Sequence, residues 1–293
     1  MRLGKHLPLS EEALTQLSQV TPLDIEAARA LWEQSVPLRW KRLLESQTVG
    51  SGEELTTPFV WDAQSRRYID RKARRYVPSQ EIRTQAIEPL IQASKAAQRG
   101  LATSLQAGDT RLSDWQRAML DQVKHTQIAA ALAANGGEES SNNVDYKKIA
   151  ALVLLLLLFL RGFAEEIAAK KQPLNGLLFL RSDLYANAAR GTFEEMRRFG
   201  MGTYYGAVQE RRRLGIAEHC HTDGDLDGCV ELHDLGWVPI HTLPKLGQTP
   251  CRTNCKCRFE YRYKDEQGNW VLVDDSATHA AIMKRLRTTD RVD

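Results

Sequence analysis

The sequence has no cysteine before position 220, no strong excess of charge and no apolar run long enough to cross a membrane. A spanning helix needs about 20 apolar residues, and the run at Ile149–Leu160 is clearly shorter. We therefore expect a helix that is buried on all sides there, in the core or against neighbouring subunits, and no membrane partner. Met1–Leu9 lacks the apolar stretch of an export signal.

Motifs of common enzyme classes are also missing. There is no GxSxG, HExxH, P-loop or dinucleotide-binding fingerprint. His233 and His241 have no evident nucleophile as a neighbour in the sequence. We therefore expect a protein that is not an enzyme. The net charge is only +3, so charge alone does not indicate nucleic-acid binding.

The spacing of apolar residues predicts a mainly α protein, in which a helical body carries a short β arm and a small cysteine-rich α+β C-terminal domain. Periodic leucines give way to glycine, proline, cysteine and aspartate after Leu214-Gly215. Arg258–Tyr263 and Trp270–Val273 are expected to be strands of a hairpin. The predicted regions are an N-terminal helical segment (1–57), a basic β-like arm (58–78), a helical body (79–214) and a cysteine-rich metal-binding domain (215–293).

The arm combines basic residues with short aromatic and β-branched segments, FVW, RYI and RYV, which predict a small β-meander or an extended arm. Such a surface suits packaged DNA or an acidic protein partner, although it is also typical of a solvated face. The candidate contact residues are Arg66, Arg67, Arg71, Lys72, Arg74 and Arg75.

All five cysteines follow within one segment, and an odd number without an export signal favours metal-bound thiolates over disulfides. Side chains two apart on an extended chain share a face, so Cys255 and Cys257 can converge on one ion. Zinc favours four thiolates, or three with an imidazole. The candidate ligands are Cys220, Cys229, Cys251, Cys255 and Cys257, with His219, His221, His233 and His241 as alternatives. Disulfides from Cys220 to Cys229 or from Cys251 to Cys257 remain open.

An acidic loop overlaps this segment and matches the D-x-D-x-D-G pattern of a calcium-binding loop. Its oxygens at positions 1, 3 and 5, and its glycine at position 6, are what such a loop needs, although Asp234 replaces the usual glutamate at position 12. Calcium is therefore a possible second ion. The candidate ligands are Asp223, Asp225, Asp227, Cys229, Glu231 and Asp234.

The order EHC, a cysteine before ELHDLGWVPI, TLP and CRTNCKCRFE resembles the C-terminal segment of phage head-morphogenesis or minor-head proteins of the phage Mu F type. The body is similar in kind, with a WD–RRYID–RRYV arm, Trp115-Gln116, Gly136-Gly137 and Phe163-Ala164, so the resemblance covers residues 58–262. It departs at His221–Gly228, which separates two cysteines that such proteins hold two residues apart.

The resemblance implies a virion structural protein, a minor head or portal-associated component that acts in head assembly or DNA packaging. Its expected partners are phage portal, capsid or connector proteins and possibly packaged DNA, in a multi-subunit assembly. Its expected locations are the virion and, during assembly, the host cytoplasm. The alternative from the residues themselves is a nucleic-acid-binding zinc-knuckle protein.

Overall fold

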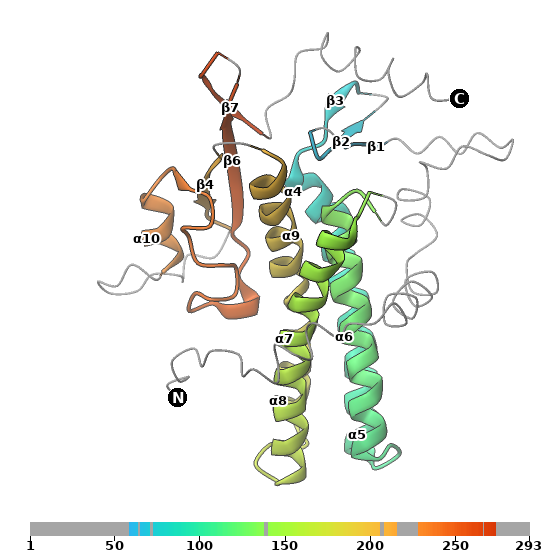
Figure 1. Ribbon diagram of the computed structural model, residues 1–293. Coiled ribbons are helices and arrows are strands. Elements are labelled where there is room, and N and C mark those ends of the chain that lie inside the picture. The colour runs from blue at the N-terminus through green and yellow to red at the C-terminus, as the bar shows by residue number, and fades with distance from the viewer. Residues whose placement is uncertain are drawn as a thin grey trace, which may run out of the picture.

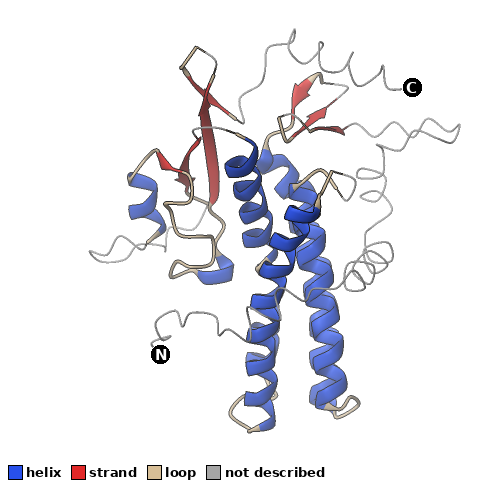
Figure 2. Cartoon of the chain, in the orientation of Figure 1, coloured by secondary structure: helices blue, strands red, loops and turns tan. Residues whose placement is uncertain are grey.

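The structure, a computed structural model, describes residues 59–63, 65–70, 73–137, 140–205, 208–215, 228–265 and 267–273. The expected N-terminal helical segment lies outside these residues. The described chain is mainly helical, with two small antiparallel sheets and a cluster of cysteines near its C-terminal end, which confirms the predicted fold class (Figures 1 and 2).

The basic arm is a three-stranded meander that is folded onto the helices. Its strands are β1 (Phe59–Asp62), β2 (Arg67–Asp70) and β3 (Arg75–Tyr76), in the order β1-β2-β3. Trp61 and Tyr68 pair across β1 and β2, with ring centroids 4.9 Å apart. The Trp61 ring covers Gly136 so closely that a Cβ atom there would overlap it, and the Tyr68 hydroxyl donates to the carbonyl of Ala133 at 3.0 Å.

The first long helix is continuous from Ser79 but contains one wide turn. It consists of α4 (Ser79–Ile82), a π-helical turn η1 (Arg83–Ile87) and α5 (Glu88–Ala107). Pro89 has no backbone N–H and its ring crowds the preceding turn, which accounts for the local widening. Gly108, at a φ of 79°, ends α5 in the left-handed conformation that glycine adopts most readily.

Four further helices complete the body: α6 (Leu112–Ala134), α7 (Asn143–Ala168), α8 (Gly176–Asn187) and α9 (Ala189–Tyr204). A capping box starts α7, because the Asn142 side chain accepts from the Asp145 N–H and the Asp145 side chain accepts from the Asn142 N–H. Helix α6 packs against α5, α7 and α9, and α8 packs against α5. The long helices thus form an elongated bundle (Figure 1).

The outer half of the bundle has a core of aliphatic and aromatic side chains. Trp115 of α6 meets Phe163 of α7 edge-to-face at 5.4 Å, and Phe163 stacks on Tyr185 of α8. Leu160 and Met119 are fully enclosed beside them. Such burial contributes roughly 1.5–3 kcal/mol for each large side chain and is sufficient to hold these helices together.

The apolar run of α7 is buried on one side only, so a helix enclosed on all sides by the chain itself was a wrong expectation. Ile149, Val153 and Leu160 face the core, whereas Leu155 is 47% exposed and Phe159 is 60% exposed. Among the described residues, helices pack against one face of α7, whereas the run is apolar all round. Burial against neighbouring subunits stays a prediction. Among the described residues, no helix has the length and hydropathy of a membrane span.

The second sheet has the order β5-β4-β6-β7. The expected hairpin is confirmed by β6 (Arg258–Lys264) and β7 (Trp270–Leu272), and β5 (Val238–Pro239) borders β4. The prediction that the helical body extends to residue 214 was wrong. Helix α9 ends at Tyr204, and Val208–Arg213 forms β4, which pairs along its length with β6. The segment VQERRR alternates inward and outward residues, but its inward side chains include Glu210 and Arg212, so no apolar alternation marked it as a strand.

Candidate metal centre

Four of the five cysteines meet beside the second sheet. Cys229 begins the short helix α10 (Cys229–Asp234), and Cys251 precedes the single turn η2 (Arg252–Asn254). Cys255 and Cys257 follow η2 on the extended chain that enters β6. The turn reverses the chain, so that all of these thiols lie against one another. Cys220 lies outside the described residues.

Three of the sulfurs form a group that could hold a metal ion, and the fourth, that of Cys251, lies beside Cys229. Cys229 Sγ lies 3.7 Å from the Sγ atoms of both Cys251 and Cys255. The Sγ atoms of Cys229, Cys255 and Cys257 all lie within 4.8 Å of one another. Four thiolates at bonds of about 2.3 Å around zinc would be about 3.8 Å apart. Cys229, Cys251, Cys255 and Cys257 are therefore compatible with a metal site.

The four described cysteines are free thiols. A disulfide needs sulfur atoms about 2.05 Å apart, far closer than the separations from Cys229. The Cys251–Cys257 disulfide is therefore not formed, and the alternative between Cys220 and Cys229 involves a residue outside the described ones. Three of the thiols are buried and Cys251 is partly exposed, so the cluster sits just under the surface.

The cluster favours one thiolate even without a metal. Hydrogen bonds from the Cys255 and Cys257 thiols lower the pKa of Cys229 well below that of an ordinary cysteine. The hydrogen bonds to Cys229 raise the pKa of Cys255 and of Cys257. A metal that replaces these thiol protons would hold all of the sulfurs as thiolates, so metal binding would release protons.

A buried arginine faces the sulfurs, and sequence reasoning missed it. Arg212 of β4 is fully buried, donates from Nη1 to Cys229 Sγ at 3.4 Å and bonds the Pro244 carbonyl through Nη2. Thr249 adds a hydroxyl 3.4 Å from both Cys229 and Cys251. A four-thiolate zinc site carries a net charge of −2, and the positive charge of Arg212 offsets part of it. In strand β4 the alternation of inward and outward residues makes Arg212 the inward member of the arginine run, but no apolar pattern in the sequence marks the segment as a strand.

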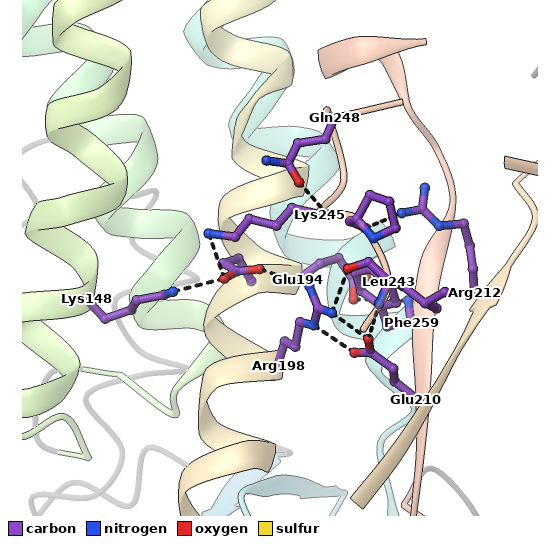
Figure 3. A network of polar contacts seen from close by, with 11 residues as sticks. Lys148, Glu194, Arg198, Glu210, Arg212, Leu243, Lys245, Gln248 and Phe259 are labelled. Atoms are coloured by element: carbon purple, nitrogen blue, oxygen red, sulfur yellow. Dashed lines mark hydrogen bonds and ion pairs between the residues drawn. The ribbon is translucent and has the colours of Figure 1, made fainter. Parts of the chain in front are cut away.

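Helix α9 joins this domain to the bundle through charged side chains. Arg198 donates from Nε to Glu210 of β4 at 2.7 Å and from Nη2 to the Leu243 carbonyl at 2.7 Å (Figure 3). Glu210 also accepts from the Leu243 N–H at 2.9 Å, and both members of the pair are buried. On the bundle side, Glu195 accepts from Lys148 of α7 at 2.9 Å.

The first helix also reaches the cysteine segment. Arg83 of η1 is buried and donates from Nη1 to the carbonyl of Cys257 at 2.6 Å. Its guanidinium lies 3.6 Å from Glu194 of α9 and 3.7 Å from Glu88. The backbone that carries the clustered thiols is thereby attached to two helices of the body.

The described histidines lie apart from the clustered thiols, and most of the acidic loop lies outside the described residues. His233 Nδ1 lies 2.8 Å from the Arg212 carbonyl oxygen, and His241 packs against Gly202 of α9, so neither is among the clustered ligands. His219, His221, Asp223, Asp225 and Asp227 lie outside the described residues. The remaining members of the calcium pattern, Cys229, Glu231 and Asp234, belong to α10.

The arginines of the arm have different environments. Arg66 is buried over the Tyr204 ring at 4.1 Å and lies 3.8 Å from Asp145, and Arg67 covers the Tyr76 ring at 3.8 Å. Arg74 is exposed, and Arg75 bonds Glu81 at 2.9 Å while it remains partly exposed. Arg71 and Lys72 lie outside the described residues. The arm therefore uses Arg66 to contact the helices and Arg67 to pack on its own strand β3, and it keeps Arg74 at the surface.

Comparisons with known proteins found no relative of this chain. No family model, no curated protein and no solved structure matches the chain.

Proposed function

We propose that this chain is a structural component of a tailed-phage particle, a minor head or portal-associated protein whose C-terminal domain is held by a structural zinc ion. The observation that carries the proposal is the convergence of the sulfurs of Cys229, Cys251, Cys255 and Cys257. These cysteines occupy the motif that resembles the C-terminal segment of phage Mu F-type head proteins.

Zinc is the ion that this donor set favours. Soft thiolates select zinc over calcium, which takes oxygen ligands. Four protein ligands close the coordination shell and leave no position for an activated water, so the site stabilises the fold and does not catalyse a reaction. The proposal therefore includes a non-enzymatic role, in which Arg212 balances the charge of the thiolates.

A role in assembly is supported by the apolar side chains that the bundle leaves at its surface. Leu177 and Leu180 of α8 are each more than half exposed. Exposed apolar clusters of this kind mark surfaces that bind other proteins. A portal, capsid or connector protein is the partner class that the phage resemblance implies.

The zinc site is tested by elemental analysis of the purified chain. We expect one zinc and no calcium per chain, with zinc lost in Cys255→Ser and in Cys229→Ser. Cys220→Ser is the matched control and should keep its zinc, because the other four cysteines already supply four ligands. Calcium alone, or zinc retained in Cys255→Ser, would contradict the assignment.

The virion role needs a separate test. Antibodies or mass spectrometry should detect the chain in purified particles of its phage and in procapsids, and deletion of its gene should yield defective heads. If particles lack the chain and form normally without it, the virion assignment fails, while the zinc result stands on its own.

DNA contact by the arm is a second candidate, favoured by the exposed Arg74. It predicts binding to duplex DNA that weakens steeply with salt, since each phosphate contact releases counterions. Arg74→Glu with Arg75→Glu should remove that binding, whereas Arg161→Glu on α7 should not. Absent or salt-independent binding would eliminate this candidate.

A further inference from the structure

The outward side of α7 carries an apolar stripe with a helical repeat. Ala151, Leu155 and Leu158 follow one another at spacings of four and three residues, which places them on one side of the helix. Leu155 and Leu158 are 47% and 38% exposed, and Phe159 borders them. The opposite side of α7 already packs on α6, so the stripe is additional to the core of the chain.

Small residues precede and follow the pair of leucines along α7. Ala151 precedes them, and Gly162 follows four residues after Leu158 on the same side. A Cβ atom added at Gly162 would meet nothing within 4 Å. The backbone of another helix can therefore approach α7 closely at either end of the leucine pair.

The charges along the same side have opposite signs at the two ends. Lys147 is exposed near the start of α7, and Glu165, which bonds Arg161 at 3.0 Å, is 66% exposed near its end. Both residues lie at helical spacing from the stripe, Lys147 four before Ala151 and Glu165 seven after Leu158. The midpoint between Leu155 and Leu158 is nearly equidistant from Lys147 and Glu165.

This symmetry points to a second copy of the chain. We infer that two chains associate through antiparallel α7 helices, about a two-fold axis between Leu155 and Leu158. Such a contact is isologous, with the same patch on both copies. Each leucine pair then packs on its counterpart, Ala151 opposes the partner's Gly162, and Lys147 opposes the partner's Glu165.

The charges select this orientation over a parallel one. In a parallel pair, Lys147 would face the partner's Lys147 and Glu165 would face the partner's Glu165, which places like charges together twice. In the antiparallel pair, both ends bring opposite charges together. Pairs at the rim add little affinity but fix the orientation of paired helices. The inference does not depend on a virion role or on zinc.

Sedimentation equilibrium of the purified full chain tests the association. We expect a concentration-dependent approach to twice the chain mass of 33.1 kDa. Leu155→Glu with Leu158→Glu should weaken the dimer by about 100-fold or more, because association would bury unpaired charges. Leu180→Glu on α8 replaces a more exposed leucine outside the stripe and should leave the dimer unchanged. A monomer at all concentrations, or a dimer unaffected by the double substitution, overturns the inference.

A charge exchange tests the orientation without touching the apolar stripe. Lys147→Glu and Glu165→Lys should each weaken the dimer by roughly threefold to tenfold at low salt, and the two together should restore it. A parallel pair would respond to neither single change, because each leaves like charges opposed. Failure of the double exchange to recover the association would therefore overturn the antiparallel arrangement, whatever the fold of the leucine variant.

Discussion

The helical bundle and the C-terminal sheet are held together by different means. In the bundle, Trp115, Leu160 and Phe163 occupy a core made of aliphatic and aromatic side chains. The sheet is small, and beside Phe259 and Tyr261 its interior contains the charged side chains of Glu210 and Arg212, with the thiol cluster next to them. Long helices bury enough apolar surface to be stable alone, whereas a sheet of this size needs other interactions.

Helix α9 shows both kinds of packing on one element. Phe193 and Met196 lie in the apolar core that α9 shares with α6, while Glu194 and Arg198 are directed at the C-terminal domain. Because those charges are buried, each depends on its partner for compensation. The boundary between the two regions therefore includes ionic contacts that hold only when both regions are folded.

Removing the proposed zinc should have the largest effect, because it should destabilise the C-terminal sheet and leave the bundle intact. Structural zinc contributes about 10–16 kcal/mol of apparent binding free energy to small domains, so chelation should unfold the C-terminal sheet. In hydrogen-exchange mass spectrometry, we expect β4 and β6 to lose amide protection while α6 and α7 keep it. Equal loss in both regions would mean that the bundle also depends on the metal, and no loss would mean that the sheet does not.

The next largest effect is expected at the ionic boundary. Glu210→Ala leaves Arg198 buried without its carboxylate and should cost about 3–5 kcal/mol in the free energy of unfolding of the C-terminal domain. Glu260→Ala is the matched control in the neighbouring strand, since Glu260 bonds Arg211 near the surface and its loss should cost less than about 1 kcal/mol. Similar costs measured by urea denaturation would contradict the assigned burial.

A cavity in the bundle should destabilise the helices and leave the C-terminal domain unaffected. Leu160→Ala removes an almost fully enclosed side chain and should cost about 2–5 kcal/mol. The loss should appear in the unfolding of the helices, while the zinc content of the purified chain stays the same. Val144→Ala, at an exposed position of the same helix, should change stability by less than about 0.5 kcal/mol.

The smallest effect concerns acid sensitivity at α9. Burial alone raises the pKa of Glu195, but the Lys148 hydrogen bond and the charges of Lys148, Lys245 and Arg198 outweigh it and hold the pKa below its ordinary value. A lowered folded-state pKa gives stability that is present above the unfolded pKa and is lost as pH falls through the folded pKa.

The variant Lys148→Met should therefore lose less stability than the wild type between about pH 5 and pH 3. Lys170→Met, at an exposed position after the end of α7, should follow the wild-type curve. Urea denaturation at several pH values measures both. Parallel curves for Lys148→Met and the wild type would show that this ion pair does not contribute to the acid response.

Elements with strong local signals could be predicted from the sequence, and those defined by distant partners could not. The Trp115 helix and the Arg258–Tyr263 strand follow from apolar periodicity and residue type. Strand β4 escaped because its inward side chains, Glu210 and Arg212, are charged and are buried only through Arg198 and Cys229, which the local pattern does not contain.

The same distinction applies to the metal site and to α7. Clustered cysteines identified the ligand type, but which thiols meet depends on how η2 and α10 fold back on the sheet. A run of leucines indicates burial without indicating by what, and one side of Leu155 and Phe159 lies at the surface of this chain.

The bond from Arg83 to the Cys257 carbonyl spans 174 residues of sequence and sets an order of events during synthesis. A ribosome adds about 5–20 residues per second, so the first long helix emerges roughly 10–30 s before the strand that accepts its arginine. Until then, the Arg83 guanidinium has Glu88 close by in its own helix, at 3.7 Å in the finished fold. The first of the described helices is thus joined to a segment made 174 residues later, and a chain terminated before Cys257 lacks the carbonyl that accepts from Arg83.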